Sequence, residues 1–213
     1  MNRVITAIKA QKKNHDRVSI FLDGEYGFGL SRIVAAWLHV GQTLDEKKIE
    51  SLLASDASEV AYAKALRLLD RKPRTAKEIS SRLAEGGFTA DQAQMVLQRL
   101  QDSGLIADEN YARQWVENRN QMHPRSRKLI ALELKQKGIA NEVIDQVLED
   151  SSSDEELAMQ AAVQYARKIR SEDRMDFRKR LSAFLARRGF TYGTIAPVVQ
   201  QVWELRESEK PSS

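Results

Sequence analysis

The stretch LAEGGF at residues 83–88 recurs as LKQKGI at 134–139 and as LARRGF at 185–190. Each copy has a leucine, a glycine four positions later and an apolar residue directly after the glycine. The step from one copy to the next is 51 residues both times. A glycine in this place is typical of a helix end, where it takes a left-handed conformation and the next residue packs back on the helix. We therefore expect three copies of one helical unit, each with a middle helix that ends at the glycine.

Helical spacing of apolar residues extends on both sides of each glycine. The same step relates two further sets of apolar positions, which are Ile79, Ile130 and Leu181, and Val96, Val147 and Val198. Apolar residues three or four positions apart form one face of a helix, so each copy predicts three helices. Their expected ranges are 58–71, 75–86 and 89–103, then 108–121, 124–137 and 140–149, and finally 154–171, 174–188 and 191–207.

Polar residues that favour helix starts precede several of these ranges. Thr75, Thr89 and Asp108 stand where N-cap side chains are expected. In the third copy, Met175-Asp176 replaces the Pro-Arg pair of the first two copies. The middle helix of that copy is therefore expected to begin with different contacts.

The beginning of the chain has a different pattern. Val18–Leu22 and Glu25–Leu30 are two strand-like runs joined by Asp23-Gly24. Asp-Gly between such runs strongly favours a β-hairpin, because glycine accepts the positive φ of a tight turn. An earlier run, Val4–Ala10, predicts a strand that pairs with this hairpin.

Two short helices are expected next, at 32–38 and 46–54, with Ser31 and Asp45 as their caps. The expected fold is mainly α, with three tandem three-helix repeats and a small N-terminal α/β unit that contains the hairpin. The expected domains are 1–57 for the N-terminal unit, 58–107 for repeat 1, 108–153 for repeat 2, and 154–213 for repeat 3 and a polar tail.

Composition limits the possible classes of protein. The 213 residues include no cysteine, and 30% are charged with a formal net charge of +4. Disulfides, thiolate nucleophiles and thiolate metal sites are therefore excluded. No apolar run approaches the roughly 20 residues of a membrane helix, and no signal-peptide stretch opens the chain. We expect a cytoplasmic protein that does not contact the membrane.

Positive charge is concentrated in the middle helices. The segments 74–88, 125–139 and 176–190 carry net charges of +1, +4 and +4, so the rest of the chain sums to −5. This concentration predicts a surface that faces an anion, although for any single residue a solvated helix face is an equally good interpretation. The candidate residues are Arg74, Arg125, Arg127, Lys128, Lys135, Arg178, Lys179, Arg187 and Arg188. Lys128 and Lys135 are seven apart and share one face, whereas Arg127 and Arg178 lie over the apolar stripe.

Other motifs carry less weight. Gly24, Gly27 and Gly29 follow the order G-x-x-G-x-G and lack a Walker lysine, so they fit the hairpin better than a nucleotide loop. The three histidines lack metal-ligand spacing, and no nucleophile–base pair is evident. Tyr111, Trp115 and Trp203 are interpreted as packing residues. We therefore expect no catalytic residue, no metal and no cofactor.

The three-helix repeat resembles the RecX family of bacterial regulators of the RecA recombinase. The resemblance lies in the segments 65–75, 78–83, 87–88, 100–112, 132–139 and 184–190. The N-terminal unit is similar, more weakly, to the extension of longer family members.

The resemblance implies a non-enzymatic modulator that binds the RecA filament on single-stranded DNA and inhibits ATP hydrolysis and strand exchange. It supplies no catalytic residues, and the basic residues above come from charge alone. The expected partners are the RecA filament and single-stranded DNA, bound directly or through RecA, and the expected state is a monomer. Two alternatives remain open, which are a stand-alone basic nucleic-acid-binding protein and a helical adaptor that binds proteins through its acidic faces.

Overall fold

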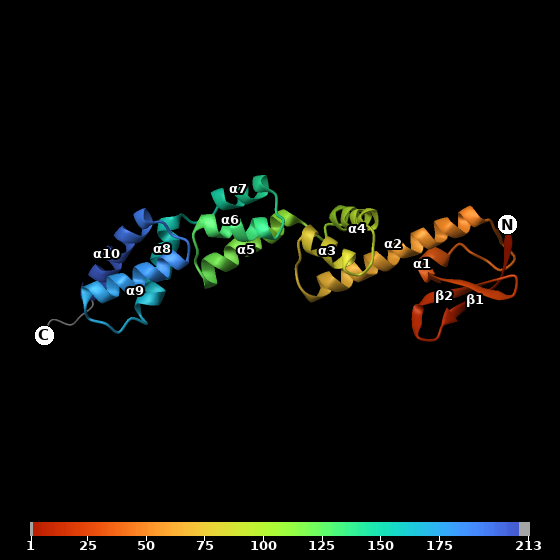
Figure 1. Cartoon of the computed structure of the whole chain (residues 1–213), viewed down its shortest axis with the longest axis horizontal. Coiled ribbons are helices and arrows are strands. Elements are labelled where there is room, and N and C mark those ends of the chain that lie inside the picture. The colour runs from red at the N-terminus through yellow and green to blue at the C-terminus, as the bar shows by residue number, and fades with distance from the viewer. Residues whose placement is uncertain (1, 209–213) are drawn as a thin grey trace. The chain divides into compact units, whose positions relative to one another are not determined.

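The computed structural model describes residues 2–208 (Figure 1). The chain forms two compact units, one up to Ile106 and one from Ala107 onward. A four-stranded antiparallel sheet begins the first unit, and helices make up the rest of both units. The expected class, mainly α with three-helix repeats after a small N-terminal sheet, is confirmed.

The sheet contains the expected hairpin. Its strands are β1 (Arg3–Gln11), β2 (Asn14–Leu22), β3 (Glu25–Ser31) and β4 (Thr43–Leu44), in the order β3-β2-β1-β4. Asp23 and Gly24 turn between β2 and β3 with φ of 51° and 91°. Alternate residues of β2, Val18, Ile20 and Leu22, point into the small core of this part.

The helices after the sheet differ from expectation. α1 (Arg32–Ala35) is shorter than the expected range 32–38. The expected helices 46–54 and 58–71 are one helix, α2 (Glu46–Arg71), so the predicted break between them is wrong.

The polar residues of the expected break have hydrogen-bond partners in the sheet or in α2 itself. Asp56 is buried, and its carboxylate accepts hydrogen bonds from the Arg17 side chain at 2.8 Å and the Ser31 backbone N–H at 2.5 Å. Ser55 and Ser58 donate their hydroxyls to backbone carbonyls four residues earlier in the same helix. The position after residue 57, where the sequence placed a domain boundary, therefore lies inside a continuous helix.

The helical units follow in chain order (Figure 1). The first pairs the C-terminal part of α2 with α3 and α4, and the next two have three helices each. The bounds of the remaining helices are α3 Ala76–Ala84, α4 Ala90–Asp102, α5 Asp108–Met122, α6 Arg127–Gln136, α7 Asn141–Glu149, α8 Asp154–Ala166, α9 Arg174–Arg187 and α10 Tyr192–Ser208.

The repeated glycines end the middle helices as the sequence predicts. Gly87, Gly138 and Gly189 have φ of 84°, 85° and 87°. After Gly87, the backbone N–H of Phe88 donates to the carbonyl of Leu83 at 3.2 Å, and the other two copies repeat this bond at 3.1 and 3.3 Å. This closure satisfies a carbonyl that the helix end would leave without a partner.

Each repeat has a core of its own. The leucines before the glycines, Leu83, Leu134 and Leu185, are fully buried, each in a separate apolar cluster. Tyr111 and Trp115 pack on the core of the second repeat, and Trp203 packs on that of the third. Their interpretation as packing residues is confirmed.

The helix starts differ among the copies. Thr75 and Thr89 cap α3 and α4 as expected, but Asp108 is the first residue of α5 and its neighbour Ala107 holds the cap position. α6 begins at Arg127, three residues later than the expected start at residue 124, and the buried Ser126 caps it. In the third repeat Asp173 caps α9. This helix therefore begins earlier in its repeat than α3 and α6 do.

Candidate functional site

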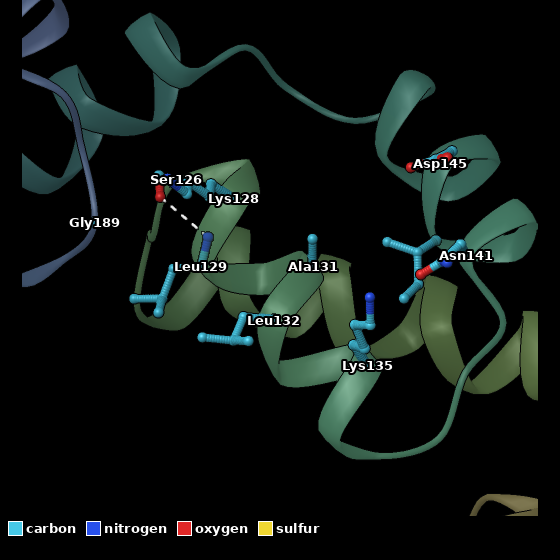
Figure 2. Close-up of a pocket in the computed structure, with 10 residues that line it drawn as sticks. Ser126, Lys128, Leu129, Ala131, Leu132, Lys135, Asn141, Asp145 and Gly189 are labelled. Carbon is cyan, nitrogen blue, oxygen red and sulfur yellow. Dashed lines mark hydrogen bonds between the residues drawn. The ribbon is translucent and has the colours of Figure 1, made fainter.

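The two lysines expected on the open face of the second middle helix are both exposed. Lys128 and Lys135 lie on α6 and line a groove of about 650 Å³ (Figure 2). The hydrogen bond from the Leu129 backbone N–H to Ser126 Oγ, 3.2 Å long, fixes the first turn of the helix that carries them. Their predicted exposure is confirmed.

The groove between α6 and α7 has a mixed lining. Leu129, Leu132 and Ile144 supply apolar surface. Asn141 and Asp145 project from α7, on the other side of the groove from the α6 residues (Figure 2). The two lysines make this surface suitable for an anionic partner, and the leucines can contact an apolar group of the same partner.

The third middle helix presents a further set of exposed charges. Arg178, Lys179 and Arg187 are exposed on α9. Arg178 borders a small hollow of about 120 Å³ together with Phe177 and Trp203. These three side chains are available to an anionic partner.

Arg127 is engaged within the protein. Its guanidinium donates to the backbone carbonyls of Ser151 and Ser152, at 3.1 Å for the latter. Its backbone N–H donates to the carboxylate of Asp154 at 2.7 Å. Arg127 therefore joins α6 to the connection between the second and third repeats. The sequence indicated a position at the edge of the core for Arg127, and the observed contacts agree with it.

Arg74, in the first repeat, is half-buried in the connection between α2 and α3. Its Nε donates to the backbone carbonyl of Leu68 at 3.2 Å, so it closes the connection between α2 and α3. The structure thus places Arg74 and Arg127 in contacts within their own units, whereas it leaves the lysines of α6 exposed.

Arg125 belongs to a charged cluster centred on Glu133. Glu133 accepts hydrogen bonds from Arg125, from Arg119 Nε at 2.8 Å and from Trp115 Nε1 at 2.9 Å. The Arg119 guanidinium also lies over the Trp115 ring, 4.4 Å from its centroid. The carboxylate side chain is 13% exposed, so these bonds form in a largely desolvated place.

The electrostatics of Glu133 follow from these contacts. Burial on its own would raise the pKa of this carboxyl, but the hydrogen bonds from Arg119 and Trp115 and the charges of Arg119 and Arg125 outweigh it. The pKa of Glu133 therefore lies below its usual range, and the group is ionised at neutral pH.

Arg188 lies on the third repeat but meets the second. Its guanidinium donates to the backbone carbonyl of Pro124 at 3.4 Å and lies 5.0 Å from the centroid of the Phe184 ring. Burial lowers the pKa of Arg188, and the nearby positive charges of Arg125 and Arg119 lower it further. The structure thus brings Arg125 and Arg188 together, although 63 positions separate them in the chain.

Arg119 was missed by the sequence reasoning because it lies on α5, outside the middle helices. One signal was present, because Arg119 follows Trp115 by four positions. That spacing places a guanidinium over an indole on the same helix face. Its approach to Arg188 depends on the packing of two repeats and has no signal in the local sequence.

Among residues 2–208, no group of His, Asp or Glu side chains is arranged to hold a metal ion. None of the helices in this range combines the length and apolar character needed to cross a membrane.

Comparison with known proteins gives matches along most of the chain. Family models described as the regulatory protein RecX N-terminal domain and as the first, second and third RecX three-helix domains match residues 3–45, 61–100, 108–148 and 153–199.

Individual proteins agree with the family models. A regulatory protein RecX of Mycobacterium leprae is 38% identical over 68% of this chain and 86% of its own length. One of Bacillus pumilus is 29% identical over 97% of this chain and 80% of its own length. A crystal structure of a regulatory protein RecX matches with a TM-score of 0.73 and 28% identity, and covers 97% of this chain and 100% of its own.

Proposed function

The chain belongs to the RecX family, and from this premise we propose that it regulates the RecA recombinase by binding the RecA–single-stranded DNA filament. Binding inhibits ATP hydrolysis and strand exchange, and so regulates recombination and DNA repair. On this proposal the protein is a non-enzymatic modulator that acts as a monomer in the cytoplasm.

The observation that carries the proposal is the ordered match of four family domains from residue 3 to residue 199. The relatives are named regulatory proteins, which favours modulation over catalysis. The match to a RecX crystal structure over nearly the whole of both chains extends this support to the arrangement of secondary structure.

The exposed basic residues supply a surface for the DNA-bearing filament. Lys128 and Lys135 on α6, and Arg178, Lys179 and Arg187 on α9, are exposed. Such residues attract phosphates over a distance set by the Debye length, which is about 8 Å at physiological salt. We assign these side chains to direct contact with the filament.

The half-buried arginines of the same set act differently. Arg74 closes the connection between α2 and α3, and Arg127 holds the start of α6 to the connection after α7, because their guanidinium groups donate to backbone carbonyls of their own units. Arg125 and Arg188 lie at the junction of the second and third repeats.

A RecA-dependent ATPase assay on single-stranded DNA, with and without this protein, tests the proposal. The rate is expected to fall with increasing protein. If ATP hydrolysis is unchanged while the protein still binds free DNA, the stand-alone nucleic-acid-binding alternative is correct. If the protein neither changes the rate of ATP hydrolysis nor binds free DNA, the adaptor alternative is favoured.

A further inference from the structure

Three arginines lie close together at the junction of the second and third repeats, and two of them bind the carboxylate of Glu133. Arg119 comes from α5, Arg125 from the connection between α5 and α6, and Arg188 from the C-terminal end of α9. Arg119 and Arg125 both bind Glu133. Because each arginine is charged at neutral pH, this group of four side chains has a net charge of +2.

The carboxylate leaves much of this positive charge without compensation. Both oxygens of Glu133 already accept arginine hydrogen bonds, and one also accepts the Trp115 N–H. Arg188 donates to a neutral carbonyl and contacts an aromatic ring, and neither contact neutralises its charge. Like charges held together in a partly desolvated place repel one another unless an anion joins them.

An unused donor lies in the same cluster. Arg125 Nε is buried and has no hydrogen-bond partner within residues 2–208. Buried polar groups in native proteins are almost always hydrogen-bonded, so an exception indicates a water, an ion or a ligand. The arginine side chains themselves remain partly accessible, with 21% of Arg119 and 33% of Arg125 exposed.

We propose that Arg119, Arg125 and Arg188 form a binding site for one backbone phosphate of single-stranded DNA. The inference rests on the proposed function, since it takes the DNA of the filament as the partner. Guanidinium groups match phosphate with paired, charge-assisted hydrogen bonds. The three donors come from three elements, which suits the tetrahedral oxygens of a phosphate better than the two coplanar oxygens of a carboxylate.

This site differs from the exposed basic face in its preorganisation. Glu133 holds Arg119 and Arg125, and the ring of Phe184 supports Arg188. Side chains held in place before binding lose little conformational entropy when the ligand arrives. The two lysines of α6 are not held as a pair in this way. The binding of a single phosphate should therefore depend more on the arginine cluster than on these lysines.

The test uses two arginines of the third repeat in the full-length protein. Arg188→Gln and Arg170→Gln each remove one positive charge, but Arg170 is exposed in the connection between α8 and α9 and is outside the residues assigned to the filament, whereas Arg188 belongs to the cluster. Binding to a fluorescent single-stranded oligothymidylate is followed by anisotropy over a range of salt. Arg188→Gln should weaken binding about tenfold, the usual loss for a charge-assisted bond. It should also reduce the salt slope by about 0.7.

Arg170→Gln should change the affinity about twofold or less. Equal losses in the two variants would show that charge density alone attracts DNA, and would overturn the site. An unchanged affinity of Arg188→Gln would overturn it as well. Thermal denaturation by circular dichroism establishes that each variant is folded.

Arg188→Lys keeps the test decisive if Arg188→Gln does not fold. Lysine retains the charge and the long stem but lacks the paired donors of a guanidinium. At least a threefold loss of affinity supports the site, and unchanged affinity overturns it.

The ATPase assay is run in parallel, so that the two proposals can fail separately. If the wild-type protein inhibits RecA but Arg188→Gln binds DNA as tightly as the wild type, the proposed function stands and the phosphate site is wrong. A wild-type protein that binds DNA through Arg188 without affecting RecA retains the site and refutes the function. A wild-type protein with no affinity for DNA refutes the site in either case.

Discussion

The backbone N–H of Ser126 donates a 3.0 Å hydrogen bond to the carbonyl oxygen of Arg188. Ser126 is the buried N-cap of α6, and Arg188 directly precedes the glycine that ends the middle helix of the next repeat. The bond therefore joins the start of one middle helix to the end of another. The start of the middle helix in the second repeat and the end of the middle helix in the third repeat look independent in sequence. Through this bond, each supports the other.

Gly189 should be more sensitive to substitution than its equivalent Gly87. Both have positive φ, but a Cβ at Gly189 would lie 2.6 Å from Ser126 Oγ and 3.0 Å from Leu129 Cβ, whereas nothing lies within 4 Å at Gly87. Gly87→Ala should cost about 1–2 kcal/mol from backbone strain. Gly189→Ala should cost about 1–3 kcal/mol more, because overpacking displaces the α6 cap. Urea denaturation of both variants measures the difference, and equal costs would contradict the close approach.

Leu134 and Lys135 are adjacent on α6, but truncation should destabilise the protein strongly at Leu134 and only slightly at Lys135. Leu134 is fully buried, so Leu134→Ala should destabilise the unit by about 2–5 kcal/mol. Lys135 is exposed, and Lys135→Ala should change stability by about 0.5 kcal/mol or less. Thermal or urea denaturation monitored by circular dichroism at 222 nm distinguishes the two. A large cost at Lys135 would show that its side chain supports the fold.

Glu133 should make stability depend on acid pH. Its folded pKa is lowered below the ordinary 4.5, so its stabilising contribution is present above that value. The contribution is lost as the pH falls through the lowered folded pKa, because protonation removes the charge that Arg119 and Arg125 bind.

Glu133→Gln should therefore be less stable than the wild type at neutral pH, and the gap should narrow as the pH falls below 4.5. Melting temperatures measured from pH 7 downward provide the comparison. A gap that stays constant over the whole range would mean that the charge of Glu133 contributes nothing.

Reversal of Lys128 and Lys135 to glutamate should weaken inhibition of RecA and flatten its salt dependence. Each lost phosphate contact lowers the slope by about 0.7 on single strands. Stability should change little, because exposed charges contribute about 0–1 kcal/mol each.

The matched control is reversal of Lys12 and Lys13, two exposed lysines in the turn between β1 and β2. It changes the net charge equally and should leave inhibition near the wild-type value. Inhibition that survives reversal in α6 would remove this face from the filament contact. The adaptor alternative forecasts no loss, since its binding surface is acidic.

The candidate site was predictable in part. The exposure of Lys128 and Lys135 follows from their spacing relative to Ile130 and Leu134 on one helix. The partners of Arg125 and Arg127 did not follow from spacing, because Glu133 and Asp154 reach them through packing across turns and repeats. The cluster with Arg119 and Arg188 is likewise a product of two repeats in contact.

The sequence by itself determined the repeated unit, the hairpin and the ends of the middle helices. These depend on short-range rules, namely helical periodicity, the Asp-Gly turn and the left-handed glycine, which act within a few residues. The tertiary structure alone decided that α2 continues through Asp56, because the Arg17 and Ser31 partners of that carboxylate come from the sheet. It also decided which basic side chains are free. Whether a charged side chain is paired depends on partners that folding brings to it from distant positions in the chain. The local sequence pattern does not show these partners.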